Sequence, residues 1–290
     1  MELRQLRYFL KAKELLNFTE AAKGLNISQS TLSHQIKQLE NELKVPLFNR
    51  IGKRITLTEA GELFHLYAMQ SLNKANEGLL LLKDLNNLVT GKITIGVIYS
   101  MRILFTKTLI DFARLYPNIK IQLVFGTTKD LLQRLDQHAF DFVITFHDSA
   151  RLPHLKYQTL LNSNMVLVTG KRSDIAKKRR LSIQEVAKLP LVLPFSGHNS
   201  IQFFDEIFSQ KKLTPNICME VNDIPTLFEI VKTGHWHTIL SDASVNDPGV
   251  VPIIIEGKKM KRTIVAISQK DAYEKKAVRK LYELMTRIQS

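Results

Sequence analysis

The chain has 290 residues, of which 44 % are hydrophobic and 23 % are charged, as in an ordinary globular protein. Its single cysteine excludes a disulfide framework and a cysteine-based zinc site. The apolar runs are far shorter than the roughly 20 residues that span a bilayer, and the first residues lack the apolar core of a signal peptide. We therefore expect a cytoplasmic protein with no membrane partner, made of two domains or of one large domain with an appendage.

The net charge of +14, from 41 basic and 27 acidic side chains, indicates a polyanionic partner. Residues 1–58 carry ten basic and five acidic side chains, whereas residues 59–91 carry two and four. The first segment is the most basic per residue, so we expect the polyanion to bind there. We interpret the basic run at residues 177–180 as a solvated loop, with a second DNA or partner contact as the alternative.

Apolar side chains at the start of the chain recur close to helical spacing and predict a first helix with one buried stripe. This stripe comprises Leu3, Leu6, Phe9, Leu10, Leu15 and Leu16. Residues 17–19 interrupt the pattern. Thr19 then predicts the N-cap of a short helix over residues 20–25.

A longer helix is predicted after Ser28, which is a second N-cap candidate. Its apolar positions Leu32, Ile36, Leu39 and Leu43 are spaced by 4, 3 and 4 residues. The opposite face carries Gln29, Ser30, Thr31, Ser33, His34 and Lys37. A short helix, a turn and a helix with such a face form a helix-turn-helix, whose second helix enters the DNA major groove. Amide and hydroxyl groups hydrogen-bond base edges, while basic groups hold phosphates.

After residues 45–50, residues 51–57 alternate around Gly52 and predict a tight hairpin with a basic tip. We interpret this hairpin as a wing. Its side chains Arg50, Lys53 and Arg54 are candidate contacts to the DNA backbone or minor groove.

Residues 59–90 predict one long helix without proline. Its apolar positions are spaced by 4, 3, 4 and 3 residues, as in the seam of a coiled coil. They are Ala68, Leu72, Ala75, Leu79 and Leu82. The stripe either packs on the DNA-binding domain of its own chain or forms a seam between two chains.

From residue 92 onward, strand patterns alternate with helical patterns, which predicts an α/β region with a parallel sheet. Ligands bind beyond the carboxyl ends of such strands, at helix N-termini. The candidate ligand contacts at those ends are Tyr99, Ser100, Thr127, Thr128, Phe146 and His147. Hydroxyl groups and free N–H groups suit a small anion. The alternative for Ser100 and Thr128 is helix capping with water in the site.

The chemistry-bearing residues outside these sites predict structure rather than catalysis. We expect Cys218 to be a buried thiol in a strand. Residues 234–237 contain the single tryptophan, Trp236, which we expect in a lobe core, with a ligand-site wall as the alternative. The histidines lack a metal-ligand pattern, and the common catalytic motifs are absent, so we expect neither a metal, nor a cofactor, nor an enzyme.

The N-terminal residues resemble the LysR-type transcriptional regulators in order and spacing. The matching residues are Phe18-Thr19, Ala21-Ala22, Leu25, Ile27-Ser28-Gln29, Leu32-Ser33, Gln35-Ile36, Leu39-Glu40, Leu43, Leu47-Phe48, Arg50 and Leu57-Thr58-Glu59-Ala60-Gly61. The sequence departs from the family at Lys44, where glycine is usual, and at His34, where a basic residue is common. Residues 234–237 also depart from the Gly-Leu-Gly pattern that the family favours.

The resemblance implies an α+β multidomain chain. A winged helix-turn-helix would occupy residues 1–58 and a linker helix residues 59–90. A two-lobed α/β effector domain, similar to periplasmic solute-binding proteins, would occupy residues 92–290. Lobe 1 would comprise about residues 92–162 and 266–290, and lobe 2 about residues 163–265. The family binds its effector between the lobes, which adds Asn199 and Ser200 as candidate contacts.

The predicted function is that of a sequence-specific DNA-binding transcriptional regulator modulated by a small effector, with an anion as the expected class. The expected partners are promoter DNA, the effector, a second copy of the chain in a dimer or tetramer, and RNA polymerase. Members of the family pair through the linker helix. The alternative is an architectural DNA-binding protein whose solute-binding domain is vestigial.

Overall fold

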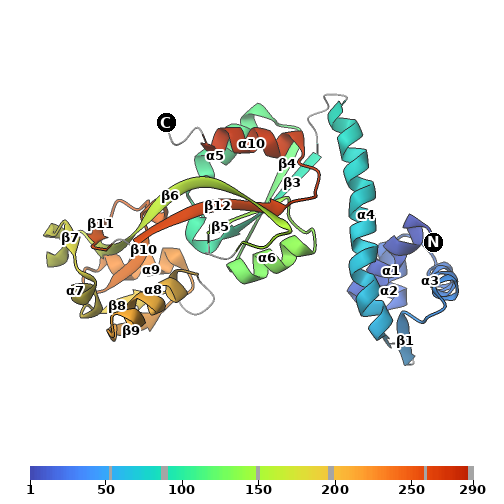
Figure 1. The fold of residues 1–290 in the computed structure, drawn as a ribbon, viewed down its shortest axis with the longest axis horizontal. Coiled ribbons are helices and arrows are strands. Elements are labelled where there is room, and N and C mark those ends of the chain that lie inside the picture. Colours follow the sequence, from blue (N-terminus) through green and yellow to red (C-terminus); the bar gives the residue numbers. More distant parts are fainter. Residues whose placement is uncertain (52–53, 86–90, 148–150, 195–198, 258–259, 287–290) are drawn as a thin grey trace. The chain divides into compact units, whose positions relative to one another are not determined.

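A computed structural model of the protein describes residues 1–51, 54–85, 91–147, 151–194, 199–257 and 260–286. For residues 51, 54, 83–85 and 199–202 it describes the backbone alone. Contacts divide the chain into two compact units, Met1–Asn87 and Leu88–Ser290. Figure 1 shows the elements of each unit.

The first unit is a small helical domain with a two-stranded hairpin. Its elements are α1 (Leu3–Leu15), α2 (Phe18–Gly24), α3 (Gln29–Leu43), β1 (Phe48–Ile51), β2 (Arg54–Leu57) and α4 (Glu59–Leu85). β1 and β2 pair antiparallel with Phe48 opposite Leu57, which confirms the predicted wing. The core gathers Phe9, Phe18 and Phe48, whose ring centroids lie 5.4 Å apart in both the Phe9–Phe48 and the Phe18–Phe48 pairs.

The helix starts in this unit differ in part from the predictions. Ser28 caps α3 as expected, because its hydroxyl accepts a hydrogen bond from the Thr31 N–H at 3.0 Å. The prediction of Thr19 as the cap of α2 is wrong. Asn17 is the cap, and its Oδ1 accepts from the N–H groups of Thr19 and Glu20. Asn17 lies two residues before Thr19, and its extended backbone lets its side chain reach both N–H groups.

The buried stripe of α1 ends sooner than the spacing predicts. Leu6 and Phe9 are buried, but Leu3, Leu15 and Leu16 are exposed. Leu16 lies in the left-handed conformation that ends the helix, so the chain turns away before these last two leucines reach the core.

The apolar stripe of α4 does not form one continuous seam. Ala68 is buried in the core of its own unit, and Leu72 packs against that core. Two of the five predicted positions therefore pack on the first unit of the same chain, as in the first of the two alternatives. Other apolar side chains of α4 are exposed, namely Leu63, Leu66, Tyr67, Leu79, Leu81 and Leu82.

The second unit begins with a sheet whose strand order is β4-β3-β5-β12-β6. Its strands are β3 (Gly91–Ile98), β4 (Ile119–Gly126), β5 (Phe142–Phe146), β12 (Lys261–Gln269) and the first part of β6 (Leu155–Gly170). β3 pairs parallel with β4 and β5, as the alternating pattern predicts. β12 inserts between β5 and β6 and pairs antiparallel with both.

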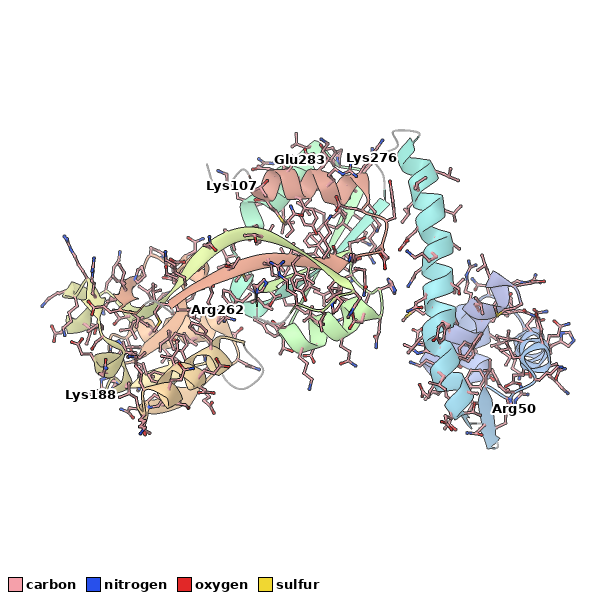
Figure 2. The ribbon with its side chains drawn as sticks, viewed as in Figure 1. Arg50, Lys107, Lys188, Arg262, Lys276 and Glu283 are labelled. Atoms are coloured by element: carbon pink, nitrogen blue, oxygen red, sulfur yellow. The ribbon has the colours of Figure 1, made fainter. Side chains whose placement is uncertain are left out.

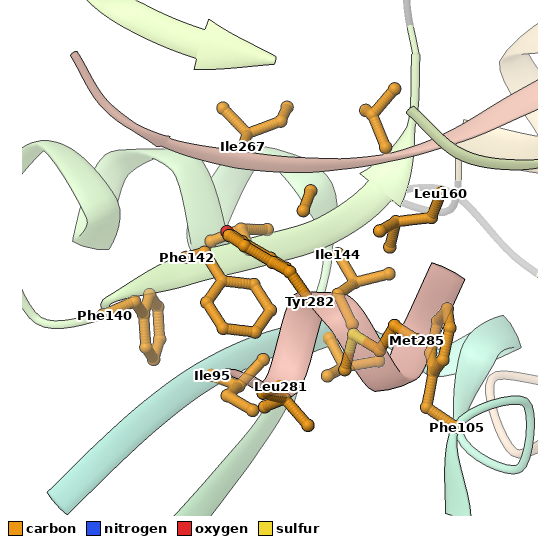
Figure 3. Close-up of a cluster of buried hydrophobic side chains, with 14 of the residues drawn as sticks. Ile95, Phe105, Phe140, Phe142, Ile144, Leu160, Ile267, Leu281, Tyr282 and Met285 are labelled. Atoms are coloured by element: carbon orange, nitrogen blue, oxygen red, sulfur yellow. The ribbon is translucent and has the colours of Figure 1, made fainter. Parts of the chain in front are cut away.

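Helices cover both faces of this sheet (Figure 1). α5 (Thr106–Leu115) packs beside α10 (Lys276–Thr286) on one face, and α6 (Thr128–Asp136) lies on the other. Figure 3 shows part of the hydrophobic core of this lobe. There the Tyr282 ring of α10 packs against Phe142 of β5, with 4.8 Å between the ring centroids. The end of the chain thus completes the lobe that its α/β region begins.

A second sheet shares β6 with the first. Residues 165–170 of β6 pair antiparallel with β10 (His237–Ser241) and with β11 (Val250–Ile255). The remaining strands are β7 (Arg180–Leu181), β8 (Leu191–Leu193) and β9 (Ile217–Glu220). β6 and β12 run side by side between the two lobes (Figure 1), so two paired strands make both crossings.

The second lobe is also covered on both faces. α7 (Ile183–Ala187) and α8 (Asn199–Gln210) share one apolar cluster, and α9 (Ile224–Lys232) lies in another. Alternate residues of β6 serve the two clusters, since Leu167 faces the first and Val168 the second. Trp236 is half-buried and packs against the second cluster.

The prediction of a buried Cys218 is wrong. Cys218 is exposed, because β9 is the end strand of its sheet and most of its side chains face outward.

Candidate DNA interface and effector site

The polar face of α3 lies opposite its buried side. Leu32, Ile36 and Leu39 are buried, and the six predicted DNA contacts of this helix lie at other positions. Of these six, Ser33 is half-buried, and Gln29, Ser30, Thr31, His34 and Lys37 are exposed.

The hydroxyl groups at the start of α3 are already engaged with one another. Ser28 Oγ lies 2.8 Å from Ser30 Oγ and 2.7 Å from Thr31 Oγ1. Gln29 and His34, in contrast, make no side-chain hydrogen bond to another described residue. Amide and imidazole groups are side-chain groups that can hydrogen-bond to a base edge.

Arg50 is oriented by three neighbours from other elements. Its Nη2 donates to Glu40 Oε2 at 3.2 Å, its Nη1 lies 3.5 Å from Ser33 Oγ, and its guanidinium stacks 5.3 Å from the Phe18 ring centroid. These contacts hold the cation next to the polar face of α3. Figure 2 labels Arg50 in this unit.

Glu40 also fixes the start of the wing. Its Oε1 accepts hydrogen bonds from the backbone N–H groups of Leu47 at 2.8 Å and Phe48 at 3.1 Å. Through this one carboxylate, α3 is connected to the backbone at the start of β1 and to the side chain of Arg50. Glu40 is one of the residues that carry the family resemblance, but the sequence did not predict that it holds the wing.

A surface hollow of about 560 Å³ lies between the end of α3 and the wing. Its lining residues are Lys37, Glu40, Asn41, Lys44, Val45, Pro46 and Arg50. Three of them are cations, a composition that suits a phosphate group. Lys44 was not among the predicted contacts, because it lies at the C-cap of α3 and its place beside Lys37 and Arg50 depends on the turn that follows the helix.

Four predicted contacts cannot be placed by their side chains. Lys53 lies outside the described residues, and the side chains of Arg54, Asn199 and Ser200 are outside the described part as well.

The predicted effector contacts of lobe 1 lie at one edge of its sheet. Ile98 pairs with Gly126 and Val97 with Ile144, so the residues that follow these strands emerge side by side. They include a short 3₁₀ helix, η1 (Tyr99–Met101). A second 3₁₀ helix, η3 (Asp242–Ser244), follows β10 of lobe 2 and contacts η1. We call this meeting place of the two lobes the lobe junction.

The two threonines at the start of α6 have separate structural partners. Thr127 caps the helix, because its Oγ1 accepts from the Asp130 N–H at 3.2 Å and donates to Asp130 Oδ2 at 2.7 Å. Thr128 is 6 % exposed, and its hydroxyl lies 2.6 Å from Thr145 Oγ1. Ser100 is buried on η1.

Phe146 packs against a buried arginine that was not predicted. Arg262 of β12 is 7 % exposed, and its guanidinium lies 4.0 Å from the ring centroid of Phe146 and 4.9 Å from that of Phe203. Phe146 belongs to lobe 1 and Phe203 to α8 of lobe 2, so this cation links the lobes. Figure 2 labels Arg262 on β12, between the lobes.

His147 lies beside other side chains of lobe 1. Its Nε2 accepts a hydrogen bond from Arg151 Nε at 3.2 Å, and its ring lies 5.7 Å from that of Tyr157. The ring is half-buried.

A polar network holds the point where β6 passes from one sheet to the other. Asp242 Oδ1 accepts from Ser163 Oγ at 2.5 Å and from the Asn164 N–H at 3.2 Å. Its Oδ2 accepts from Asn164 Nδ2 at 3.0 Å, and Ser163 Oγ is also hydrogen-bonded to Ser241 Oγ. This network fixes the position of η3 relative to the crossing strand.

Neither a metal-binding cluster nor a membrane-spanning helix is found among the described residues. They contain no group of three or more His, Cys, Asp or Glu side chains arranged to hold a metal ion. Among the helices that they form, none has the length and apolar composition needed to cross a membrane.

Comparison with known protein families accounts for both units. Residues 3–62 match the family described as "Bacterial regulatory helix-turn-helix protein, lysR family", and residues 86–289 match the "LysR substrate binding domain". A helix-turn-helix followed by a substrate-binding unit defines a DNA-binding transcriptional regulator with an effector domain. The chain belongs to the LysR family.

Individual relatives are distant but extend over almost the whole chain. The transcriptional activator CmpR of Synechocystis sp. is 28% identical and aligns with 92% of this chain and 89% of its own length. A probable RuBisCO transcriptional regulator of Thalassiosira pseudonana is also 28% identical, over 95% of this chain and 94% of its own. Both are named as transcriptional regulators.

Solved structures share the fold. A full-length OxyR variant from Pseudomonas aeruginosa superposes with a TM-score of 0.79 at 21% identity, over 98% of this chain and 94% of that chain. Full-length CbnR, solved with its target DNA, gives a TM-score of 0.67 at 22% identity, over 99% of both chains.

Proposed function

We propose that α3 reads promoter DNA in the major groove through Gln29, Ser30, Ser33 and His34, with Thr31 beside them. The observation that carries this proposal is the exposed polar face of α3 opposite its buried leucines and isoleucine. Lys37, Arg50, Lys53 and Arg54 would hold phosphates. The cationic hollow at the end of α3 supports phosphate contact and adds Lys44 to this set.

The test begins with selection of binding sites from random DNA by the full-length protein. Gln29→Ala should then weaken binding to the selected site much more than binding to random DNA, because an amide reads base edges. Lys37→Ala should weaken both and lower the salt slope of log K by about 0.9 per lost phosphate contact. Lys23→Ala, on the exposed side of α2, is the matched control. Equal losses on both DNAs in Gln29→Ala would refute base reading by this residue.

We further propose that the protein is a dimer paired through α4, able to assemble into a tetramer. The exposed apolar side chains of α4 support this proposal, since an apolar surface on one helix is stabilised when a second copy covers it. Two recognition helices would then reach two half-sites. The double variant Leu79→Glu/Leu82→Glu should sediment as a monomer, whereas Leu81→Glu tests a neighbouring position of the same helix. An unchanged sedimentation coefficient in the double variant would exclude this part of α4 from the interface.

We infer that the second unit binds a small anionic effector at the lobe junction. The predicted contacts are Tyr99, Ser100, Thr127, Thr128, Phe146, His147, Asn199 and Ser200. The family assignment of residues 86–289 as a substrate-binding domain supports a ligand, and the buried hydroxyl groups and arginine support an anion. Because Thr127 and Thr128 already have partners, Ser100 is the hydroxyl that we expect to contact the effector directly.

A thermal-shift screen of metabolite anions tests this proposal. A ligand at 100 times its Kd should add about 2.7 kcal/mol to the free energy of unfolding. The stabilisation should disappear in Ser100→Ala and persist in Thr108→Val, which removes a buried hydroxyl of α5 that is none of the predicted contacts. An anion whose effect survives both Ser100→Ala and Thr128→Ala would move the site elsewhere. The absence of any stabilising anion would favour the architectural alternative.

We propose the division of the chain into a DNA-binding domain (1–58), a linker helix (59–90) and an effector domain (92–290). A promoter-bound regulator acts beside RNA polymerase, so we also propose a cytoplasmic location and a contact with that enzyme. Co-purification of the polymerase on promoter DNA, with a DNA fragment lacking the selected site as the control, tests the contact.

A further inference from the structure

One ion pair joins the two lobes among the residues that the structure describes. Arg102 follows η1 in lobe 1, and Asp223 is the N-cap of α9 in lobe 2. Arg102 Nη1 lies 4.0 Å from Asp223 Oδ1, and the two side chains are 48% and 50% exposed. The cation and the carboxylate therefore face each other from opposite sides of the lobe junction.

This ion pair is loose. At 4.0 Å the two groups attract each other, but the distance exceeds that of a direct hydrogen bond. The guanidinium is positioned from its other side, since it lies 5.4 Å from the ring centroid of Phe125 on β4. Within the described residues, Arg102 donates no side-chain hydrogen bond. Its planar fork is thus pre-oriented while its N–H groups remain available to a ligand.

Asp223 does not depend on Arg102 for its place. Its Oδ2 accepts from the Thr226 N–H at 3.0 Å and from Thr226 Oγ1 at 2.7 Å, which caps α9. These hydrogen bonds, together with the nearby Arg102 charge, hold the pKa of Asp223 below its ordinary value. The carboxylate is therefore charged at neutral pH, and α9 keeps its cap when Arg102 moves to another partner.

A buried polar group on η3, the element that contacts η1, lacks a partner among the described residues. Ser244 of η3 is 4 % exposed, and its hydroxyl makes no hydrogen bond to any other described residue. An unsatisfied buried hydroxyl is unfavourable, so it favours a ligand that supplies the missing bond. η3 contacts η1, which carries Ser100 and precedes Arg102.

We propose that Arg102 recognises the charged group of the effector, that this group is a carboxylate, and that Asp223 occupies its place until the effector binds. A carboxylate matches the guanidinium fork in bidentate geometry, and the group it displaces is itself a carboxylate. Ser244 and Ser100 would bind the effector's remaining polar atoms. Release of Asp223 would loosen the ionic link between the lobes. This inference rests on the proposed effector site at the lobe junction.

The proposal predicts opposite effects for the two partners. Asp223→Asn removes the competing charge and keeps the helix cap, since asparagine caps as well as aspartate. An exposed ion pair contributes about 0.2–1 kcal/mol, so this variant should bind carboxylates about one and a half to five times more tightly. Arg102→Gln should lose carboxylate binding. Glu185→Gln is the matched control, because Glu185 also belongs to a helix-capping box and forms an exposed ion pair, with Lys178.

The experiment titrates full-length protein with sodium formate, acetate and benzoate, against sodium chloride at equal ionic strength. The fluorescence of Trp236, the single tryptophan, reports changes beyond the end of α9, and the melting temperature is a second readout. We expect binding in the wild type and in Glu185→Gln, tighter binding in Asp223→Asn and none in Arg102→Gln.

Other outcomes distinguish the role of Arg102 from the existence of an effector site at the lobe junction. Binding that is unchanged in Arg102→Gln and Asp223→Asn but lost in Ser100→Ala overturns the role of Arg102 and leaves the effector site standing. Sodium sulfate that binds as tightly as benzoate, and only when Arg102 is present, overturns the preference for a carboxylate. A wild type that responds to none of the three carboxylates overturns the recognition by Arg102, whereas the anion-binding site is decided separately by the thermal-shift screen of metabolite anions.

Discussion

Replacement of Glu40 tests how the wing is held on the recognition helix. In Glu40→Ala the backbone N–H groups of Leu47 and Phe48 lose their carboxylate acceptor, and Arg50 loses its ion pair. Hydrogen bonds to a charged group contribute about 1.5–3 kcal/mol each, whereas an ion pair to a half-exposed arginine adds at most about 1 kcal/mol. Water can replace part of the loss, so we expect destabilisation of about 2–4 kcal/mol.

Glu40→Gln separates the charge from the hydrogen bonds. The amide oxygen can still accept from both N–H groups, but it no longer pairs with Arg50. We expect a loss of about 1 kcal/mol in this variant. Glu20→Ala is the control, because Glu20 makes an exposed ion pair with Lys23 and holds no backbone group.

Hydrogen–deuterium exchange of peptides that cover residues 44–58 measures these effects in the full-length protein. Exchange in the wing should accelerate in the order wild type, Glu40→Gln, Glu40→Ala, and Glu20→Ala should match the wild type. Equal exchange in Glu40→Ala and Glu20→Ala would show that Glu40 does not hold the wing, and the reasoning from its hydrogen bonds would be wrong.

Three further predictions concern backbone conformation, close packing and pH. Lys44→Gly should stabilise the first unit by about 0.5–1 kcal/mol in urea unfolding, because Lys44 adopts a left-handed φ of 58° that glycine tolerates better; an unchanged midpoint would contradict this. Gly61→Ala should destabilise it by about 2 kcal/mol or more, since a Cβ there would lie 2.2 Å from the Leu47 carbonyl oxygen. Gly78→Ala, in an open part of the same helix, should instead stabilise it by up to about 1 kcal/mol. Burial and nearby His235 lower the pKa of His237, so the unfolded chain binds more protons below about pH 6.5 and the second unit should lose stability as pH falls through that value; His237→Gln should flatten this dependence in melting curves.

The elements of the first unit could be predicted because each has a local signal. The apolar spacing of α3 and the cap at Ser28 lie within one stretch of chain, and the basic hairpin has its turn residue between its strands. The start of α2 was missed because Asn17 and Thr19 are both good caps, and only the backbone path decides between them.

The sheets of the second unit were only partly predictable. The parallel pairing of β3 with β4 and β5 follows from the alternation of strands and helices. The length of β6 could not be predicted from this alternation. Its first part pairs in one sheet and its second part in another, so the pattern of buried side chains changes along the strand. The exposure of Cys218 likewise depends on β9 being an end strand, which composition alone does not reveal.

The candidate sites show the same division. The polar face of α3 is a local property, so its helical spacing could be recognised within one stretch of the sequence. The partners of Thr128, Phe146 and Arg102 lie far away in the sequence, on Thr145, Arg262 and Asp223. Such pairs form only when the sheets are assembled. A single sequence does not show which distant residues will meet, so it gives no signal for these pairs.

The position of β12 also constrains the order in which this chain can fold. β12 is the last strand of the second unit in the sequence, yet it lies between β5 and β6 in the sheet. During synthesis, β5 and β6 therefore leave the ribosome with unpaired edges, which stay open until residues 261–269 arrive. A nascent chain that stops before β12 already contains all the strands from β7 to β11 of its second lobe. It should still need protection from edge-to-edge aggregation.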